Sequence, residues 1–274
     1  MNIKLAEEAG FCFGVKRALD RVDRIKDKDD VYVLGRLIHN PQVIGELKKQ
    51  GVRFIEDIDE INHGTLVISA HGVSDRIMRG AREKNLDIID TTCPLVTNVH
   101  NITRDLEKQG YRVMIFGDRK HTEVRGVMGN LKDPIVISDI SEIQGMEEGR
   151  YALVSQTTNN VAEFEEISRM LKDRIKGLVI KDTICSATKL RQESAKRLAR
   201  ESDLMIVIGG YNSANTRSLA SICSGITETR HIENADELRK EWFEGKENIG
   251  VSAGASTPEN VIREVIDRIK CKGL

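Results

Sequence analysis

The sequence is poor in aromatic residues, and its charges nearly cancel. Aromatic side chains make up only 4% of the 274 residues, so Ile, Leu, Val and Ala must fill the core. That is ordinary in parallel α/β proteins, whose strands are covered on both faces. Lys and Arg total 42 against 43 for Asp and Glu, which leaves a formal net charge of −1. This balance provides no field that would attract nucleic acid or an anionic membrane, and we expect neither as a partner.

The sequence also lacks targeting and membrane-spanning segments. Residues 1–8 have no apolar core of the kind found in signal peptides, and no apolar run approaches the ~20 residues that span a bilayer. We therefore expect a soluble, cytoplasmic protein. In that reducing compartment the five cysteines, an odd number, are not expected to form disulfides. Metal, cluster or catalytic roles, or burial, remain for them.

Three of the cysteines recur in matching local settings. They lie in Gly10-Phe11-Cys12-Phe13, Asp90-Thr91-Thr92-Cys93 and Asp182-Thr183-Ile184-Cys185. From each, a mostly polar helical segment leads to an apolar run that ends in a glycine 23 or 24 residues later. This repetition predicts three lobes, 12–92, 93–184 and 185–274. Cys223 and Cys271 have no counterparts in the repeat, and we expect structural roles for them.

Each copy of the repeat alternates strands with helices. This order predicts an α/β fold in which every lobe has a small, mainly parallel four-stranded sheet. The third copy lacks a last strand, and residues 2–6 are predicted to supply it, so that segment 1–11 completes the third lobe. The lobes would then close into a pseudo-threefold ring. Because ligands of such units bind at the carboxyl ends of strands, where the three cysteines lie, a shared central site is expected.

Three converging thiolates suit few occupants. Structural zinc prefers four protein ligands, often as paired C-x-x-C knuckles, and the sequence has no such pair. Catalytic zinc, with three protein ligands and one open position, remains possible. A 4Fe-4S cluster held by three cysteines would leave one iron open to substrate. Spacing favours the iron-sulfur cluster over zinc and over plain buried thiols.

Polar side chains occupy the loops that follow the strands. Four residues after three of the strand-ending glycines come His39, His121 and Ser213. A second set of loops carries His71, Thr157 and Ser256. Short hydrogen-bonding side chains with helix N-termini behind them suit phosphate oxygens, so the loops predict an anion site.

Glu123, two residues after His121, is the one carboxylate among the residues singled out in these loops. It is an unexpected neighbour for an anion, which makes it a candidate proton donor. The alternative is that Glu123 has only a structural role, as an acidic residue in the first turn of a helix, where the helix dipole favours negative charge.

Taken together, these motifs resemble the 4-hydroxy-3-methylbut-2-enyl diphosphate reductase family. The resemblance runs in unbroken order from Cys12 to Pro258. The stretches that carry it are Gly10–Val15, His39–Pro41, Ser69–Gly72, Asp90–Pro94, His121–Glu123, Gln156–Thr158, Cys185, Ser213–Thr216 and Ala253–Ser256.

The resemblance implies a three-lobed fold around one 4Fe-4S cluster, held by Cys12, Cys93 and Cys185, whose fourth iron binds the substrate hydroxyl. Two electrons and two protons would remove water from the allylic diphosphate, giving isopentenyl and dimethylallyl diphosphates in the last step of the methylerythritol phosphate route. It further implies that the substrate is surrounded by His39, His71, His121, Thr157, Ser213, Ala214, Asn215 and Ser256. Glu123, His121 and Thr157 would be catalytic, with Glu123 supplying a proton through Thr157. Ala214 stands where many members carry serine.

The electrons would come from outside the chain. The glycine-rich segments form no dinucleotide fingerprint after a strand, so an external ferredoxin or flavodoxin is expected as the electron donor. We expect the enzyme to be a monomer. Two alternatives remain: a hydro-lyase in which the open iron acts only as a Lewis acid, and a non-catalytic iron-sulfur sensor that binds a partner. The many polar donors at strand ends argue against the sensor.

Overall fold

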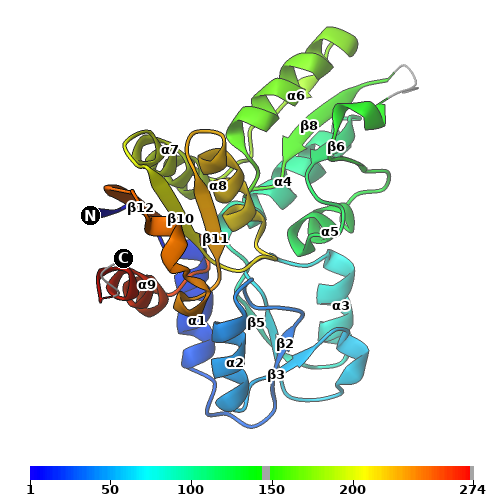
Figure 1. Cartoon of the computed structure of the whole chain (residues 1–274). Coiled ribbons are helices and arrows are strands. Elements are labelled where there is room, and N and C mark those ends of the chain that lie inside the picture. The colour runs from blue at the N-terminus through cyan, green and yellow to red at the C-terminus, as the bar shows by residue number, and fades with distance from the viewer. Residues whose placement is uncertain (144–148, 272–274) are drawn as a thin grey trace. The chain divides into compact units, whose positions relative to one another are not determined.

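Three four-stranded sheets form the framework of the computed structural model, which describes residues 1–143 and 149–271 (Figure 1). Every recorded strand pairing is parallel, so the expected three-lobed α/β fold is confirmed, and the sheets are wholly rather than mainly parallel. Parts of two expected lobes, residues 144–148 and 272–274, lie outside the described residues.

The first sheet has the order β3-β2-β4-β5 and the second the order β7-β6-β8-β9. The strands of the first are β2 (Val31–Leu34), β3 (Arg53–Ile55), β4 (Thr65–Ile68) and β5 (Asp87–Asp90), accompanied by helices α1 (Phe13–Asp23), α2 (Pro41–Lys49) and α3 (Asp75–Glu83). Those of the second are β6 (Arg112–Phe116), β7 (Ile135–Ile137), β8 (Tyr151–Ser155) and β9 (Val179–Ile180), with α4 (Pro94–Lys108), α5 (Thr122–Met128) and α6 (Val161–Arg174).

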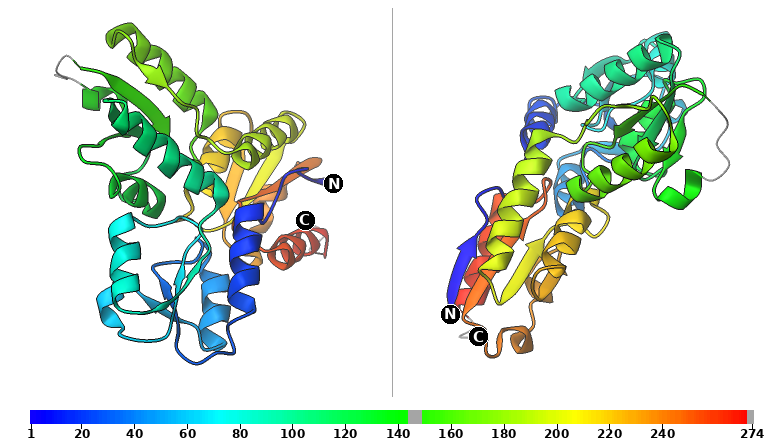
Figure 2. Two further views of the ribbon diagram at one scale, coloured as in Figure 1. Left: turned by 180° about the vertical axis from the view of Figure 1, so that it is seen from behind. Right: turned by 90° about the horizontal axis from the view of Figure 1, so that it is seen from above.

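The third sheet combines both ends of the chain, in the order β1-β12-β10-β11. Its strands are β1 (Asn2–Leu5), β10 (Leu204–Ile208), β11 (Thr229–Ile232) and β12 (Asn248–Ala253), and its helices are α7 (Ser186–Arg200), α8 (Ala214–Ser224) and α9 (Glu259–Cys271). Strand β1 pairs with β12 from Asn2 opposite Asn248 to Leu5 opposite Val251, and Figure 2 shows it at the edge of this sheet. The expectation that the N-terminal segment supplies the missing strand is thereby confirmed.

The repeated acidic motif after the second strand of each lobe forms a 3₁₀ turn. These turns are η1 (Ile58–Glu60), η2 (Ile140–Ile143) and η3 (Ala235–Glu237), and a further one, η4 (Lys240–Phe243), follows in the third lobe. In η1 the side chain of Asp57 accepts from the N–H of Asp59, while Glu60 accepts from the N–H of Asp57. This reciprocal capping explains why the motif recurs with Asp or Asn first and Glu three residues later.

The apolar strand runs are buried on both faces. In β10 (LMIVI), the side chains of residues 204, 206 and 208 belong to a cluster with α9, whereas Met205 and Val207 belong to another with α7 and α8. Alternation along the strand sends successive side chains to opposite faces, so a strand covered on both sides must be apolar throughout. Cys223 is fully buried in the second of these clusters, and burial raises its pKa to about 12, in keeping with a structural role.

Contacts divide the chain into two compact units. Unit 1 comprises Met1–Lys16, His39–Ile44 and Ser186–Leu274, and unit 2 comprises Arg17–Ile38 and Gly45–Cys185. Unit 1 therefore contains the third sheet, and unit 2 the first and second sheets. Among the described helices, none combines the length and apolar character that crossing a membrane requires.

One helix is shorter than the sequence pattern predicts. Apolar spacing predicts a helix over residues 13–26, but α1 ends at Asp23. Beyond Asp23 the chain forms turns with hydrogen bonds between residues three apart. The N–H of Ile25 donates to the carbonyl of Val22, and the N–H of Lys28 donates to the carbonyl of Ile25. The prediction was wrong at this end because these turns continue to bury Ile25 without continuing the helix.

Candidate active site

The three repeat cysteines occupy matching junctions in the structure. Each follows the edge strand of a sheet and precedes a long helix: Cys12 between β1 and α1, Cys93 between β5 and α4, and Cys185 between β9 and α7. The backbone N–H of Cys12 donates to the carbonyl of Ala255 (3.1 Å), that of Cys93 to Ala70 (3.0 Å) and that of Cys185 to Thr157 (3.0 Å). Each acceptor lies in the loop after the neighbouring strand, so one backbone device fixes all three positions.

All three thiols are half-buried rather than sealed in the core. Cys93 is the N-cap of α4, and the carbonyl of Cys12 accepts the N–H of Lys16 at the start of α1. The N-terminus of a helix favours negative charge, so these positions suit thiolates. Soft thiolate donors in equivalent, accessible settings fit iron-sulfur chemistry better than that of a hard, oxygen-liganded cation.

Glu123 lies in the first turn of α5 but is not a surface capping residue, because only 2% of it is exposed. Both of its carboxyl oxygens bond to Thr157: the backbone N–H donates to Oε1 and the side-chain hydroxyl to Oε2, each at 2.6 Å. Burial raises the pKa of Glu123, and the two bonds from Thr157 only partly oppose that shift. The site therefore favours the protonated acid.

Thr157 connects Glu123 to a cysteine junction. Its hydroxyl bonds the carboxyl group, while its carbonyl accepts the N–H of Cys185. The whole contact lies within unit 2. A candidate proton donor is thus one residue removed from a predicted cluster ligand.

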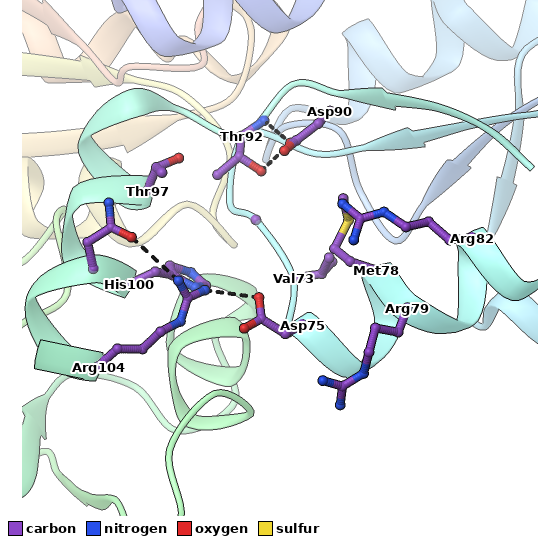
Figure 3. A pocket seen from close by; sticks show the side chains of 12 residues that line it. Val73, Asp75, Met78, Arg79, Arg82, Asp90, Thr92, Thr97, His100 and Arg104 are labelled. Carbon is purple, nitrogen blue, oxygen red and sulfur yellow. Dashed lines mark hydrogen bonds and ion pairs between the residues drawn. The ribbon is translucent and has the colours of Figure 1, made fainter. Parts of the chain in front are cut away.

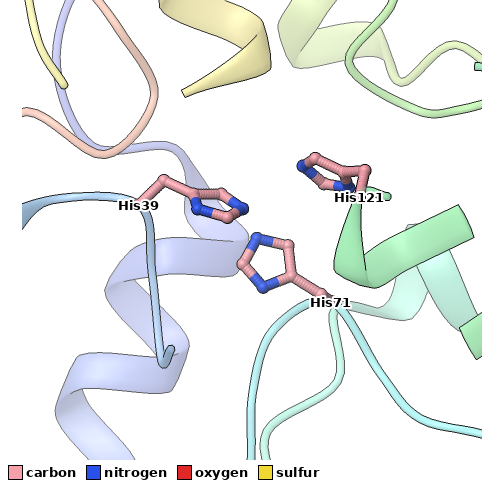
Figure 4. Close-up of side chains that lie close together, drawn as sticks. All are labelled: His39, His71 and His121. Atoms are coloured by element: carbon pink, nitrogen blue, oxygen red, sulfur yellow. The ribbon is translucent and has the colours of Figure 1, made fainter. Parts of the chain in front are cut away.

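His71 and His121 approach each other within the same unit. Their ring centroids are 5.5 Å apart and the rings are nearly perpendicular, as Figure 4 shows. His121 is the N-cap of α5, and its Nδ1 accepts the N–H of Glu123 at 3.2 Å. With Nδ1 used as an acceptor, the proton of a neutral His121 ring resides on Nε2, which can donate to a ligand.

Two glycines allow this approach. A Cβ at Gly126 in α5 would lie 3.3 Å from the carbonyl oxygen of Gly72, and one at Gly129 would lie 2.6 Å from the Cβ of Ser74. The absence of side chains at both positions lets α5 pack directly on the loop that carries His71.

Unit 1 holds a second group of predicted site residues. Ser213 caps α8, and its hydroxyl oxygen accepts the N–H of Thr216 at 3.3 Å. The hydroxyl of Ser256 donates to the carbonyl of His39 at 3.1 Å. Ala214 is the first residue of α8, so it offers a backbone N–H at the positive end of the helix.

Asn215 is the least satisfied of these residues. It is 3% exposed, and neither Oδ1 nor Nδ2 has a hydrogen-bond partner among the described residues. A buried amide without partners is costly, and a polar group bound nearby would remove that cost.

The predicted site residues fall evenly between the two units. Unit 2 holds His71, Cys93, His121, Glu123, Thr157 and Cys185, and unit 1 holds Cys12, His39, Ser213, Ala214, Asn215 and Ser256. Within unit 2 the structure joins Glu123, Thr157 and Cys185, and brings together the two histidines. Within unit 1 it joins Ser256 to His39.

Sequence reasoning missed a cavity of about 450 Å³ in unit 2, between α3 and α4. Gly72 and Thr92, the neighbours of His71 and Cys93, both line it, and Figure 3 shows Arg104 meeting Asp75 there, at 2.9 Å. His100 also lines it, and burial lowers the pKa of its imidazole to about 4. The signal was the helical spacing of Thr97, His100 and Arg104 after Cys93, which places these side chains on one face.

The chain is similar to known reductases over nearly its whole length. A profile of the LytB protein family matches residues 3–270. A relative from Clostridioides difficile (strain 630), named 4-hydroxy-3-methylbut-2-enyl diphosphate reductase, is 44% identical over 273 residues, covering 97% of this chain and 98% of the relative.

Solved structures of such reductases are also similar to this chain. One, of (E)-4-hydroxy-3-methyl-but-2-enyl diphosphate reductase, described as the terminal enzyme of the non-mevalonate pathway, has 42% identity and a TM-score of 0.71, covering 98% of this chain and 99% of that one. Another, of E-1-hydroxy-2-methyl-but-2-enyl-4-diphosphate reductase from Plasmodium falciparum, has 28% identity and a TM-score of 0.94, covering 97% and 87%. Together with the repeated cysteine junctions, these matches show that the chain belongs to the LytB protein family.

Proposed function

We propose that this protein is a 4-hydroxy-3-methylbut-2-enyl diphosphate reductase, which removes the hydroxyl group of its allylic substrate to give isopentenyl and dimethylallyl diphosphates. This is the last step of the methylerythritol phosphate, or non-mevalonate, route to isoprenoids. The observation that carries the proposal is the connected set Glu123, Thr157 and Cys185, in which a buried acid lies beside a cysteine junction. Family membership supports the same activity.

Cys12, Cys93 and Cys185 would hold one 4Fe-4S cluster, with the fourth iron open to the substrate hydroxyl. Their half-buried thiols, matching backbone settings and positions at helix starts fit this group. When bound, such a cluster supplies electrons and a Lewis-acidic iron.

Glu123 would deliver a proton to the leaving oxygen. In its protonated form the carboxyl group donates to the hydroxyl of Thr157, which can pass its own proton onward, so the pair forms a short relay. Burial keeps this acid protonated at a pH where an exposed carboxyl would be ionised. His121 is tied to the same turn through the N–H of Glu123 and would orient the substrate beside the relay.

The diphosphate would be held by hydrogen-bond donors from the strand-end loops. The donors are His39, His71, His121, Thr157, Ser213, Asn215 and Ser256, and Ala214 would contribute only its backbone N–H. The unpartnered amide of Asn215 supports this assignment, and so does the helix start at Ser213. Binding of the diphosphate would hold the substrate alcohol at the reacting position. Contacts far from the C–O bond would in this way raise the rate at which that bond breaks.

The two electrons would come from an external ferredoxin or flavodoxin, because the sequence has no dinucleotide fingerprint. The protein would act as a monomer in the cytoplasm.

The function is tested by anaerobic turnover of the allylic diphosphate with dithionite-reduced methyl viologen. We expect two equivalents of reduced viologen to be oxidised for each alkene diphosphate formed. Loss of substrate without viologen oxidation, giving a redox-neutral dehydration product in place of the alkene diphosphates, would indicate the hydro-lyase alternative. Absence of any conversion by iron-replete protein would refute the proposed activity and leave the sensor.

A further inference from the structure

An arginine bonds the backbone directly before Cys93. Arg17, in α1, donates through Nη1 to the carbonyl of Thr92 at 2.8 Å and to that of Thr91 at 3.2 Å. It is half-buried, and all of these atoms lie within unit 2. Both acceptors are carbonyl oxygens, which orient the guanidinium group but do not neutralise its charge.

A second arginine repeats the arrangement before Cys12. Arg191, in α7, is 3% exposed, and its Nη2 donates to the carbonyl of Gly10 at 2.8 Å, within unit 1. Gly10 is two residues before Cys12, just as Thr91 is two residues before Cys93. Its φ is +83°, a conformation that favours glycine, so the carbonyl which Arg191 holds belongs to a specially shaped turn.

The two arginines lie at similar offsets in the repeat, which differ by one residue. Arg17 lies five residues after Cys12 and bonds the junction of Cys93, the next cysteine along the chain; Arg191 lies six residues after Cys185 and bonds the junction of Cys12. In both cases the helix that begins at one cysteine supplies the arginine for the next junction of the cyclic repeat. Neither contact follows from amphipathic helix packing, because the acceptors are loop carbonyls.

We propose that Arg17 and Arg191 are positioning residues for the iron-sulfur cluster. Each holds a peptide group one or two residues before a cysteine ligand and places a permanent positive charge at that junction. Planar guanidinium groups suit this role because their fixed donors can span successive carbonyls and cannot lose a proton. Partners around metal ligands orient them and tune the metal centre, and nearby charge shifts the potential of an iron-sulfur cluster. The inference rests on the proposed function, since it requires that the cysteines bind a cluster.

Arg17→Gln and Arg17→Lys separate charge from geometry. In protein reconstituted anaerobically, we expect Arg17→Gln to lose iron to a chelator about tenfold faster than wild type, and its EPR-monitored midpoint potential to move to more negative values. Arg17→Lys keeps the positive charge but loses the planar guanidinium group. The midpoint potential of the cluster should therefore stay near that of wild type, while iron loss is still accelerated. Arg191→Lys should behave in the same way.

Arg24→Gln is the matched control, because Arg24 is an exposed arginine just beyond α1 and the substitution removes the same charge. If Arg17→Gln and Arg191→Lys both match this control in iron release and potential, the inference is overturned. Should Arg17→Gln fail to fold, the same comparison is made with Arg17→Lys. Failure of the proposed function has a different signature: wild-type protein that holds iron would not convert the allylic diphosphate, whereas failure of the cluster assignment would leave wild-type protein without iron.

Discussion

Glu123 is a carboxyl group removed from water, and both of its oxygens bond the same residue, Thr157. Gln has nearly the same shape, so Glu123→Gln can keep a bond to the N–H and to the hydroxyl of Thr157 but cannot transfer a proton. We expect turnover to fall by about 10²- to 10⁴-fold, with cluster content and substrate binding retained. Turnover with reduced viologen, iron analysis and calorimetric titration of substrate measure the three quantities.

Glu165→Gln in α6 serves as the control for that substitution, because Glu165 is exposed. Wild-type turnover in Glu123→Gln would remove Glu123 from the proton path.

The same burial gives the wild-type protein a pH signature. Because the folded-state pKa of Glu123 is raised above its ordinary 4.5, the fold favours the neutral acid. Its contribution to stability is fully present below the unfolded-state pKa and is lost as pH rises through the folded-state pKa. Denaturant unfolding of wild type across that range should show this loss, and Glu123→Gln should lack it. Parallel curves for the two proteins would contradict the raised pKa.

Replacement of Asn215 should raise the stability of the protein and lower its affinity for substrate. Its buried amide lacks partners among the described residues, so Asn215→Leu removes unsatisfied polar atoms while keeping the branched shape of the side chain. We expect the substrate-free variant to be more stable by about 1 kcal/mol, since burying an unsatisfied polar group costs about that much or more. Substrate affinity should fall. Chemical denaturation and calorimetry test both, and a variant with weakened stability and unchanged affinity would show that Asn215 is an ordinary core residue.

Single residues show where sequence reasoning reaches its limit. The positions of Cys12, Cys93 and Cys185 at strand ends were predictable, because a repeated βα order places equivalent residues at equivalent edges. The bonds of Arg17 were not, and helical spacing placed His100 on a shared face without revealing the cavity beside it. Such contacts depend on side-chain directions and on segments over 70 residues apart, as from Arg17 to Thr91, which local periodicity does not encode.

Among the elements, α5 depends most on close approach. Gly129 ends this helix with φ −66°, which any residue can adopt, but a Cβ there would lie 2.6 Å from the Cβ of Ser74. Gly129→Ala should therefore destabilise the protein by roughly 1–3 kcal/mol through overpacking, and should lower turnover by moving α5 and His121 away from His71. Thermal unfolding and turnover report the two effects.

Ser74→Gly provides the matched second change. The side chain of Ser74 makes no capping bond at the start of α3, so its loss should cost only a few tenths of a kcal/mol. In a double-mutant cycle, Gly129→Ala combined with Ser74→Gly should recover most of the lost stability. Strict additivity of the two substitutions would show that the contact is not the cause.

Element boundaries were predictable to within a few residues wherever packing set them. The strands β2, β4 and β10 coincide closely with their apolar runs because each is covered on both faces. The end of α1 was not predictable, because Ile25 fits the apolar spacing of a helix but is buried from a turn that follows the helix. The apolar pattern records which residues are buried and leaves open the backbone conformation that buries them.

For the whole molecule, the decisive pairing is that of β1 with β12. Deleting residues 2–5 would leave β12 without its partner and would free the segment leading to Cys12. We expect anaerobically reconstituted protein to hold less iron after this deletion, whereas Ile3→Val, which keeps the strand, should hold as much as wild type. Iron and sulfide analysis decides, and undiminished iron in the deletion variant would show that β1 is dispensable for the site.

The same pairing sets the order in which the protein can be completed during synthesis. Asn2–Leu5 leaves the ribosome long before its partner strand, which ends at Ala253. At about 5–20 residues per second, the N-terminal segment waits on the order of ten to fifty seconds for that partner. The segment containing Cys93 and Cys185 is translated earlier than β12, so the junction of Cys12, the first cysteine to emerge, is the last to form. If Cys12 is a cluster ligand, as proposed, loading of the cluster should accordingly follow translation of β12.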